Sequence, residues 1–276
     1  MQRDLAPLDL APVDLASVDL APVDLERLLA VSLDAARRAG AAIMEVYAAD
    51  FAVGRKGDAS PVTLADHRAE AIICPALRAA AGIPVVAEEE CEARGVPETA
   101  PERFWLVDPL DGTKEFINRN GEFTVNIALV EHGLPVLGVV LVPTTGIAYT
   151  ALGAGTARRW RGTAAAEPIG ARPVPPEGLT VVHSRSHESS AALGAYLADK
   201  KVAAMRVSGS SVKLCLLAAG EADLYPRFGP TMEWDTAAGH AVLLAAGGSV
   251  VTHEGTALRY GKPGFRNPGF IARGLP

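Results

Sequence analysis

The feature that most constrains this chain is the segment 105–116, Trp-Leu-Val-Asp-Pro-Leu-Asp-Gly-Thr-Lys-Glu-Phe. A short apolar run delivers two carboxylates, Asp108 and Asp111, into a turn that contains proline and glycine, and the hydroxyl of Thr113 follows at once. Mg²⁺ in proteins is held by one or two carboxylates together with phosphate oxygens of the substrate. The segment therefore predicts half of a metal-assisted phosphate site, although Asp-Pro and Asp-Gly pairs also form ordinary turns.

Length and charge limit the class of protein. The 276 residues suffice for one large domain or two fused sub-domains. A formal net charge of −6 and the lack of a basic tract argue against a nucleic-acid partner. A small anionic substrate stays possible in principle, because bound metal ions invert the local charge. The sequence leaves the oligomeric state open.

Cysteine usage and hydropathy indicate a cytoplasmic protein. The three cysteines are far apart and form no CxxC pair, which fits a reducing compartment. We find no apolar run of the ~18 residues that a transmembrane helix needs. The first residues also lack the basic-then-apolar pattern of a signal peptide. We expect a cytoplasmic location, with peripheral attachment to the cytoplasmic face of the inner membrane as a variant of it.

The first 25 residues repeat a five-residue unit, with LDLAP, VDLAS, VDLAP and VDLER in succession. Recurrent proline prevents a continuous helix, and large apolar side chains are too few for a core. We predict a disordered extension over 1–25, with partner docking as the alternative.

From residue 26 onward the spacing of apolar residues predicts regular helices and strands, and the pattern changes after the Pro/Ala-rich stretch at 164–177. This spacing predicts helices over 26–49 and 66–81, the second capped by Thr63 or Asp66. Strands are expected at 83–87, at 104–107 ending in Asp108, and at 123–131, 135–143 and 147–152. Beyond a Pro/Ala-rich stretch, strands and helices alternate. We predict an α/β protein, with an α+β metal-site sub-domain at 26–165 and an α/β substrate-binding sub-domain at 166–276.

Several acidic residues share one context, at the end of an apolar strand or the start of a helix. They are Asp66, Glu88, Glu89, Asp108, Asp111 and Asp235. Side chains at strand ends converge on one edge of an α/β sheet, where their charges repel unless a divalent cation binds. Taken singly, Asp66 and Asp235 could instead be helix caps, and 88–90 could be a solvated acidic loop.

Four of these motifs resemble the inositol monophosphatase superfamily in order and approximate spacing. They are Pro61-Val62-Thr63-x-x-Asp66, Glu88-Glu89, the string 108–113 and Trp234-Asp235-x-Ala237-Ala238-Gly239. Narrower strings at 111–129, 184–187 and 224–231 are similar to its bacterial 3'(2'),5'-bisphosphate nucleotidase branch. The resemblance covers roughly residues 28–270, and four motifs in order are far more specific than one.

The resemblance implies a layered αβαβα fold and a Mg²⁺-dependent phosphatase. Its substrate would be a small nucleotide bisphosphate, with adenosine 3',5'-bisphosphate hydrolysed to AMP and phosphate. Hydrolysis of 3'-phosphoadenylyl sulfate to adenylyl sulfate is also implied, which would connect the protein to sulfur assimilation. One alternative is an inositol or sugar monophosphatase with the same metal site. Another is a non-catalytic, metal-binding regulatory protein.

The resemblance also implies a set of site residues. Two or three Mg²⁺ ions would be held by Glu88, Asp108, the carbonyl of Leu110, Asp111 and Asp235. Thr113, supported by Asp66, would orient and deprotonate the attacking water. The amides of Gly112 and Thr113 would face phosphate oxygens, so that these residues and the metal ligands Glu88, Leu110, Asp111 and Asp235 would also contact substrate.

The nucleotide end of the substrate would be bound by His187, Ser210, Lys213 and Arg227. Arginine binds phosphate through two parallel hydrogen bonds, so Arg227 and Lys213 suit a second phosphate group. A monophosphate needs this pair less. Ser210 could equally be a plain helix cap, and His187 could be an ordinary surface histidine.

Overall fold

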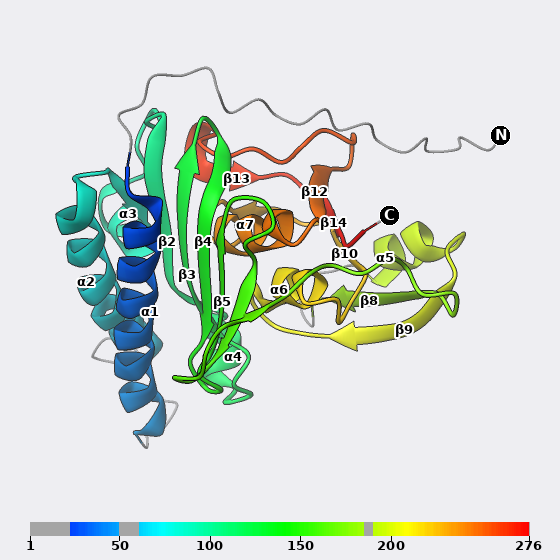
Figure 1. The fold of residues 1–276 in the computed structure, drawn as a ribbon, viewed down its shortest axis with the longest axis horizontal. Helices are drawn as coiled ribbons and strands as arrows, with labels where there is room; N and C mark the ends of the chain where they lie inside the picture. Colours follow the sequence, from blue (N-terminus) through cyan, green and yellow to red (C-terminus); the bar gives the residue numbers. More distant parts are fainter. Residues whose placement is uncertain (1–22, 50–60, 185–189, 276) are drawn as a thin grey trace.

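The computed structural model describes residues 23–49, 61–184 and 190–275 of the chain. Its helices and sheets stack in five layers, in the order helix, sheet, helix, sheet, helix (Figure 1). Helices lie on either side of each sheet, although the edge strand β9 (Val202–Val207) of the second sheet is largely exposed. The predicted layered αβαβα fold is therefore confirmed.

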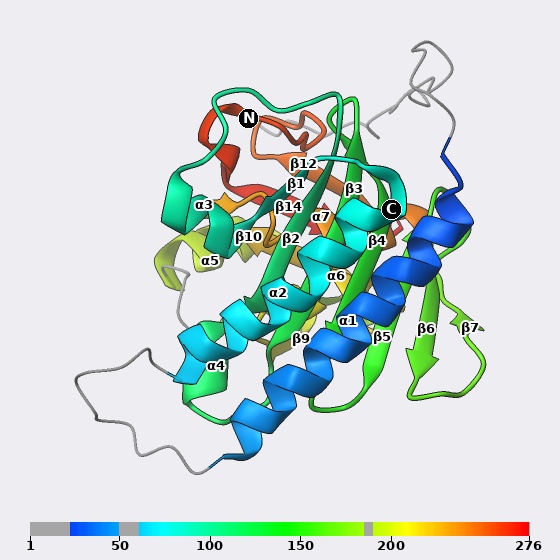
Figure 2. The same ribbon diagram turned by 90° about the vertical axis from the view of Figure 1, so that its left-hand side faces the viewer.

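The first layer consists of α1 (Leu25–Ala48) and α2 (Pro61–Ala81), which lie side by side across one face of the first sheet (Figure 2). Asp24 caps α1, because its Oδ1 accepts a hydrogen bond from the backbone N–H of Arg27 at 2.9 Å. The start predicted for the second helix is wrong. Since α2 begins at Pro61, Thr63 and Asp66 lie inside it and cannot be its N-cap.

The first sheet has seven strands in sequence order. The first two strands are parallel and the others antiparallel. Their bounds are β1 (Val85–Ala87), β2 (Arg103–Asp111), β3 (Thr124–Glu131), β4 (Leu134–Val142), β5 (Ile147–Leu152), β6 (Arg158–Arg161) and β7 (Glu167–Pro168). The three strands expected between 123 and 152 are confirmed. The strand expected to end at Asp108 runs on to Asp111, and β6 was not predicted because its arginine-rich sequence lacks apolar alternation.

The middle layer consists of α6 (Val212–Ala218) and α7 (Ala237–Ala245), packed between the two sheets. Almost every residue of both helices is buried, as expected for helices that are apolar on all sides. Contact with β4 is close at Gly138, where an added Cβ would lie 2.4 Å from the carbonyl oxygen of Ala238. This glycine lets α7 approach the first sheet.

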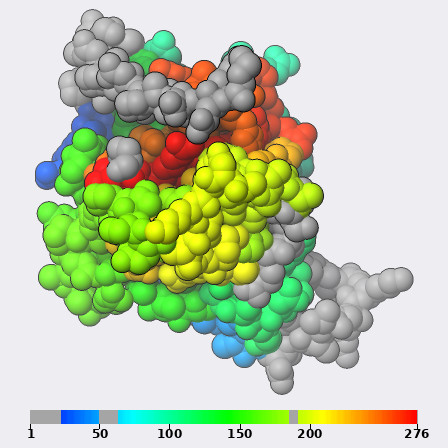
Figure 3. Space-filling model, turned by 90° about the vertical axis from the view of Figure 1, so that its right-hand side faces the viewer, coloured from blue at the N-terminus to red at the C-terminus, as the bar shows by residue number. Residues whose placement is uncertain are grey.

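The second sheet has the strand order β12-β14-β10-β8-β9. It contains β8 (Leu179–His183), β9 (Val202–Val207), β10 (Leu224–Arg227), β12 (Ser249–Thr252) and β14 (Phe270–Arg273). Helix α5 (Ser190–Leu197) packs on its outer side, where α5 and the edge strand β9 form the molecular surface (yellow in Figure 3). The antiparallel strand β14 was not predicted.

Short elements complete the fold and carry parts of the site. They are α3 (Glu88–Arg94), α4 (Thr113–Ile117), the pair β11 (Thr231–Met232) and β13 (Arg266–Asn267), and a 3-10 helix at Pro263–Phe265. The acidic run at 88–90 is not a solvated loop, because it forms the first turn of α3. Asp235 does not cap α7, because Thr236 occupies the N-cap position.

One continuous core crosses the predicted boundary at residue 165, because α7 packs directly on β3, β4 and β5. The division into 26–165 and 166–276 stays a proposal about the organisation of the chain. The predicted disordered repeat at 1–25 lies outside the described residues up to residue 22. Within the described ranges, every helix is too short or too polar to cross a bilayer.

Candidate active site

A cavity of about 270 Å³ lies where residues of the first sheet meet residues of the second half of the chain. Its wall contains all the predicted metal ligands, namely Glu88, Asp108, Leu110, Asp111 and Asp235. It also contains most of the predicted substrate contacts, namely Gly112, Thr113, Ser210, Lys213 and Arg227. Residues from Glu88 to Asp235 therefore share one cavity, as the motif pattern predicted.

The motif 108–113 is shaped by a bulge at the end of β2. Pairing with β3 is regular up to Asp108 and resumes only at Asp111, which lies opposite Thr124. Pro109 has no N–H to donate, and Oδ1 of Asp108 accepts the N–H of Leu110 at 3.0 Å. Gly112 follows with φ +102°, a conformation that favours glycine. The bulge thus places both aspartates on the cavity wall.

The second half of the chain completes the cavity. Oδ2 of Asp235 accepts the backbone N–H of Met232 at 2.9 Å, which holds this carboxylate in the turn that precedes α7. On the opposite wall, the N–H of Ser211 donates to Oδ2 of Asp111 at 2.5 Å. Ser211 Oγ also donates to Oδ1 of Asn126 at 2.6 Å. These bonds connect the loop before α6 to β2 and β3.

Burial and mutual repulsion raise the pKa of each clustered carboxyl group. Burial is the largest cause for Asp108, followed by the charges of Glu88, Asp111 and Asp235, and its pKa lies well above the usual range. The pKa of Glu88 rises to about 8, and that of Asp235 to about 7, for the same reasons. Burial also raises the pKa of Asp111, but the charge of Lys213 and the hydrogen bond from the Ser211 N–H act against this rise. The cluster is short of positive charge.

This donor set fits a hard divalent cation. It offers carboxylate oxygens and a carbonyl, the ligands that Mg²⁺ prefers, and contains no sulfur or imidazole. Burial and, after it, the charges of the neighbouring carboxylates raise these pKa values, and a bound cation would offset both costs. The chemistry of the residues is therefore consistent with the predicted metal ligands.

Lys213 and Arg227 form the cationic side of the cavity, and both are buried. The ammonium of Lys213 donates to the carbonyl of Ser210 at 2.5 Å and lies 5.2 Å from the ring centre of Tyr225. Arg227 donates from Nη1 to Ser184 Oγ at 3.2 Å. These bonds hold both cations at the cavity wall, where the charge of Lys213 acts on Asp111 and that of Arg227 acts on Asp235.

Two predicted residues stand apart from this wall. Asp66 lies buried in α2 and is not part of the cavity lining, although its charge acts on Asp108 and its own pKa rises to about 9 through burial and the charges of Glu89 and Glu88. His187 lies outside the described residues. The pairing of Asp66 with Thr113 therefore stays a prediction.

Sequence reasoning missed several residues that shape the site. Ser211 and Asn126 support Asp111, while Ser184 and Tyr225 contact the two cations. Asn126, Ser184 and Tyr225 lie within the strings at 111–129, 184–187 and 224–231, but nothing in those strings assigns them a role. Ser211 follows the Gly209-Ser210 pair at the start of α6.

Comparison with known proteins defines the class. Residues 24–272 match the model of the Inositol monophosphatase family, which covers nearly all of the described fold. The chain therefore belongs to the inositol monophosphatase family.

Within the family, the chain is similar to bacterial enzymes named 3'(2'),5'-bisphosphate nucleotidase CysQ. It is 48% identical over 240 residues to the CysQ of Escherichia coli K12, an alignment that covers 85% of this chain and 95% of the relative. The crystal structure of CysQ from Bacteroides thetaiotaomicron superposes with a TM-score of 0.78 at 39% identity, over 90% of this chain and 97% of that one. An inositol monophosphatase from Anabaena superposes with a TM-score of 0.73 at 25% identity, over 92% of each chain.

Proposed function

We propose that this chain is a Mg²⁺-dependent bisphosphate nucleotidase that hydrolyses adenosine 3',5'-bisphosphate to AMP and phosphate. The observation that carries the proposal is the presence of Lys213 and Arg227 in the cavity that contains the carboxylate cluster. A carboxylate cluster that would hold Mg²⁺ and two buried cationic side chains in the same cavity suit a substrate with two phosphates. Similarity to the CysQ nucleotidases supports the same substrate class.

Glu88, Asp108, Asp111, Asp235 and the carbonyl of Leu110 would hold two or three Mg²⁺ ions. Bound Mg²⁺ would supply positive charge to the phosphoryl group and to the attacking and leaving oxygens. The protein itself then positions the substrate, as is usual in phosphoryl transfer. The backbone amides of Gly112 and Thr113 would donate hydrogen bonds to phosphate oxygens.

Thr113 would orient the attacking water and pass its proton toward Asp66. Thr113 lies at the cavity wall, and Asp66 lies in α2 outside the lining. Burial raises the pKa of Asp66 to about 9. The positive charge of bound Mg²⁺ would lower this pKa, so that the Asp66 carboxylate could accept the proton. Ser210 and His187 are proposed to contact the nucleotide.

A steady-state comparison tests the substrate. The purified chain with Mg²⁺ should hydrolyse adenosine 3',5'-bisphosphate with a much higher kcat/KM than inositol 1-phosphate. Preference for the inositol ester would instead support an inositol or sugar monophosphatase with the same metal site. Release of no phosphate from any ester tested would support a non-catalytic, metal-binding regulatory protein.

We extend the proposal to 3'-phosphoadenylyl sulfate, whose 3'-phosphate would occupy the same position at the carboxylates. A role in sulfur assimilation follows from that substrate. The proposed location is the cytoplasm, which agrees with three free cysteines in the described residues. Attachment to the inner membrane stays a prediction for which the described surface offers no support.

A further inference from the structure

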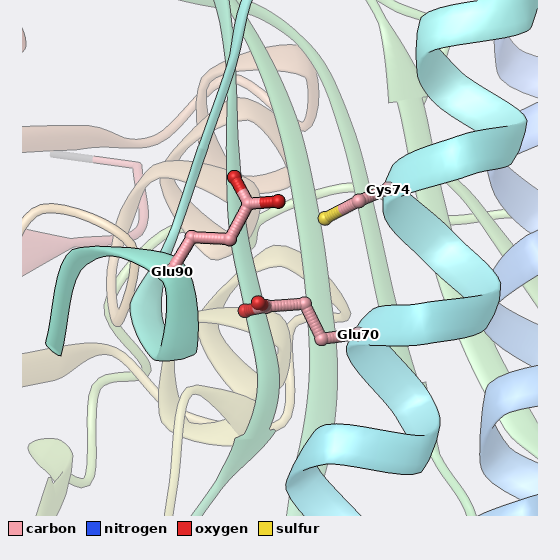
Figure 4. A group of neighbouring side chains, drawn as sticks. All are labelled: Glu70, Cys74 and Glu90. Atoms are coloured by element: carbon pink, nitrogen blue, oxygen red, sulfur yellow. The ribbon is translucent and has the colours of Figure 1, made fainter. Parts of the chain in front are cut away.

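A second group of metal-ligating side chains lies between α2 and α3, outside the cavity. Glu70 and Cys74 are one turn apart on α2, and Glu90 lies in the first turn of α3 (Figure 4). One ligand atom of each of the three residues lies within 4.8 Å of the others. None of the three residues lines the cavity of the candidate active site.

Burial separates this group from an ordinary acidic surface cluster. Glu70 is 7% exposed and Cys74 only 2% exposed. In Figure 4 the sulfur of Cys74 points toward the space between the two carboxylates. Across the described ranges the structure gives this thiol no hydrogen-bond partner, so packing alone leaves a buried polar group unused.

The charges around the group are only partly balanced. Arg78 donates from Nη2 to Oε2 of Glu90 at 2.6 Å and neutralises that carboxylate. Glu70 accepts the backbone N–H of Glu89 at 3.0 Å, and the backbone N–H of Glu90 also lowers its pKa. Within the described part of the chain, Glu70 forms no ion pair with an arginine or lysine. Burial, assisted by the charges of Glu90 and Glu89, raises the pKa of Glu70 to about 7 despite the hydrogen bond from Glu89. Arg78 is therefore paired with Glu90, and its charge acts more weakly on Cys74 and Glu70.

We propose that Glu70, Cys74 and Glu90 form a second metal site, which binds a thiophilic divalent cation of the Zn²⁺ class and not Mg²⁺. Zn²⁺ binds cysteine sulfur at about 2.3 Å and carboxylate oxygen at about 2.0–2.2 Å. The three ligand atoms lie within 4.8 Å of one another and would move slightly closer to share one ion. Sulfur selects against Mg²⁺, which takes oxygen ligands. Binding releases the thiol proton of Cys74 to solvent, and a water would fill the fourth position.

The site would connect α2 to α3 next to the candidate active site. Glu70 is one helical turn from Asp66, and Glu90 is two residues from Glu88. A cation that binds both helices would hold α3 in its place on α2, and would add to the bond between Glu89 N–H and Glu70 and to the contacts Arg78–Glu90 and His67–Glu89. A metal ion at the second site would therefore stabilise the neighbouring residues of the candidate active site.

Titration of the full chain with Cd²⁺ under saturating Mg²⁺ and a non-thiol reductant tests the proposal. Cadmium bound to a thiolate produces a charge-transfer absorption in the ultraviolet, whereas cadmium bound to carboxylates alone does not. The wild type should develop this band with one equivalent of Cd²⁺. Cys74→Ser should abolish it, while the matched control Cys215→Ser, at a buried cysteine in α6, should retain it.

A carboxylate variant keeps the test decisive if Cys74→Ser folds poorly. Glu90→Gln should weaken Cd²⁺ binding by more than about tenfold, because loss of a direct ligand costs at least as much as loss of an outer-shell partner. Glu92→Gln, at an exposed position of the same helix, should leave the affinity unchanged. Absence of the band in the wild type, its persistence in Cys74→Ser, or equal affinity in Glu90→Gln would overturn the proposal. None of these outcomes depends on the phosphatase substrate.

Discussion

The backbone N–H of Ser211 donates a hydrogen bond to Oδ2 of Asp111 at 2.5 Å, across 100 positions of sequence. Asp111 ends a strand of the first sheet, and Ser211 immediately precedes α6 in the second half of the chain. The bond orients one oxygen of a proposed metal ligand and lowers the pKa of its carboxyl group. The two halves of the chain therefore depend on each other for the geometry of the candidate site.

This relationship predicts the effect of Asp111→Asn. The variant should lose at least about a hundredfold in Mg²⁺-dependent turnover, because it removes a charged metal ligand whereas even outer-shell changes cost about 10–100-fold. The fold should persist, since the amide oxygen can still accept the Ser211 N–H. Phosphate release and circular dichroism would measure the two effects. Asp199→Asn, at a side chain that is 82% exposed, is the matched control, and full activity in Asp111→Asn would contradict the assignment.

Arg227 should determine preference for the second phosphate. Arg227→Gln should lower kcat/KM for adenosine 3',5'-bisphosphate by about 10–100-fold, the equivalent of one charge-assisted hydrogen bond of roughly 1.5–3 kcal/mol. Turnover of inositol 1-phosphate should change little. Arg259→Gln, an exposed arginine outside the cavity, should affect neither substrate. An equal loss with both substrates would mean that Arg227 only supports the fold through Ser184.

His240 should make stability depend on pH. It is buried in α7 and its Nδ1 lies 2.9 Å from the hydroxyl of Tyr260, while burial and Lys262 lower its pKa to about 3. The unfolded chain takes up this proton below about pH 6.5 and the folded chain does not, so stability should fall as the pH decreases from 6.5 toward 3. The contribution is on the order of 1.4 kcal/mol per pH unit.

Urea unfolding of the wild type and His240→Gln over this range would measure the effect. Glutamine cannot be protonated, so its curve should be flatter by about that slope. Parallel curves would show that the buried histidine does not carry the dependence.

Gly138 should be intolerant of a side chain. An alanine Cβ would lie 2.4 Å from the Ala238 oxygen and 2.8 Å from the Ala241 Cβ, so α7 would have to move away from β4. Gly138→Ala should destabilise the protein by about 1–3 kcal/mol, measured by urea unfolding. Gly194→Ala is the control, because Gly194 lies in α5 with nothing near its missing Cβ, and it should raise stability slightly. Equal stability of the two variants would refute the packing argument.

The sequence by itself determined the elements and the type of chemistry. Local patterns sufficed for α1 and for β3 to β5, because amphipathic periodicity depends on nearby residues alone. The aspartates of the 108–113 motif also carried their own signal, since a carboxylate pair in a Pro/Gly turn is unusual within an apolar strand. Strand β14 was not predicted, because its place in the sheet comes from pairing with the distant β10 and β12.

Only the tertiary structure decided which of these residues meet. Thr63 and Asp66 were expected to cap a helix, but α2 starts earlier and places Asp66 inside it, where burial raises its pKa to about 9. Ser211, Asn126 and Ser184 gained their roles from contacts between segments some 40 to 100 residues apart. The same holds for Glu70, Cys74 and Glu90, which approach one another because α2 and α3 cross. Such contacts depend on the packing of layers, which no local pattern of residues records.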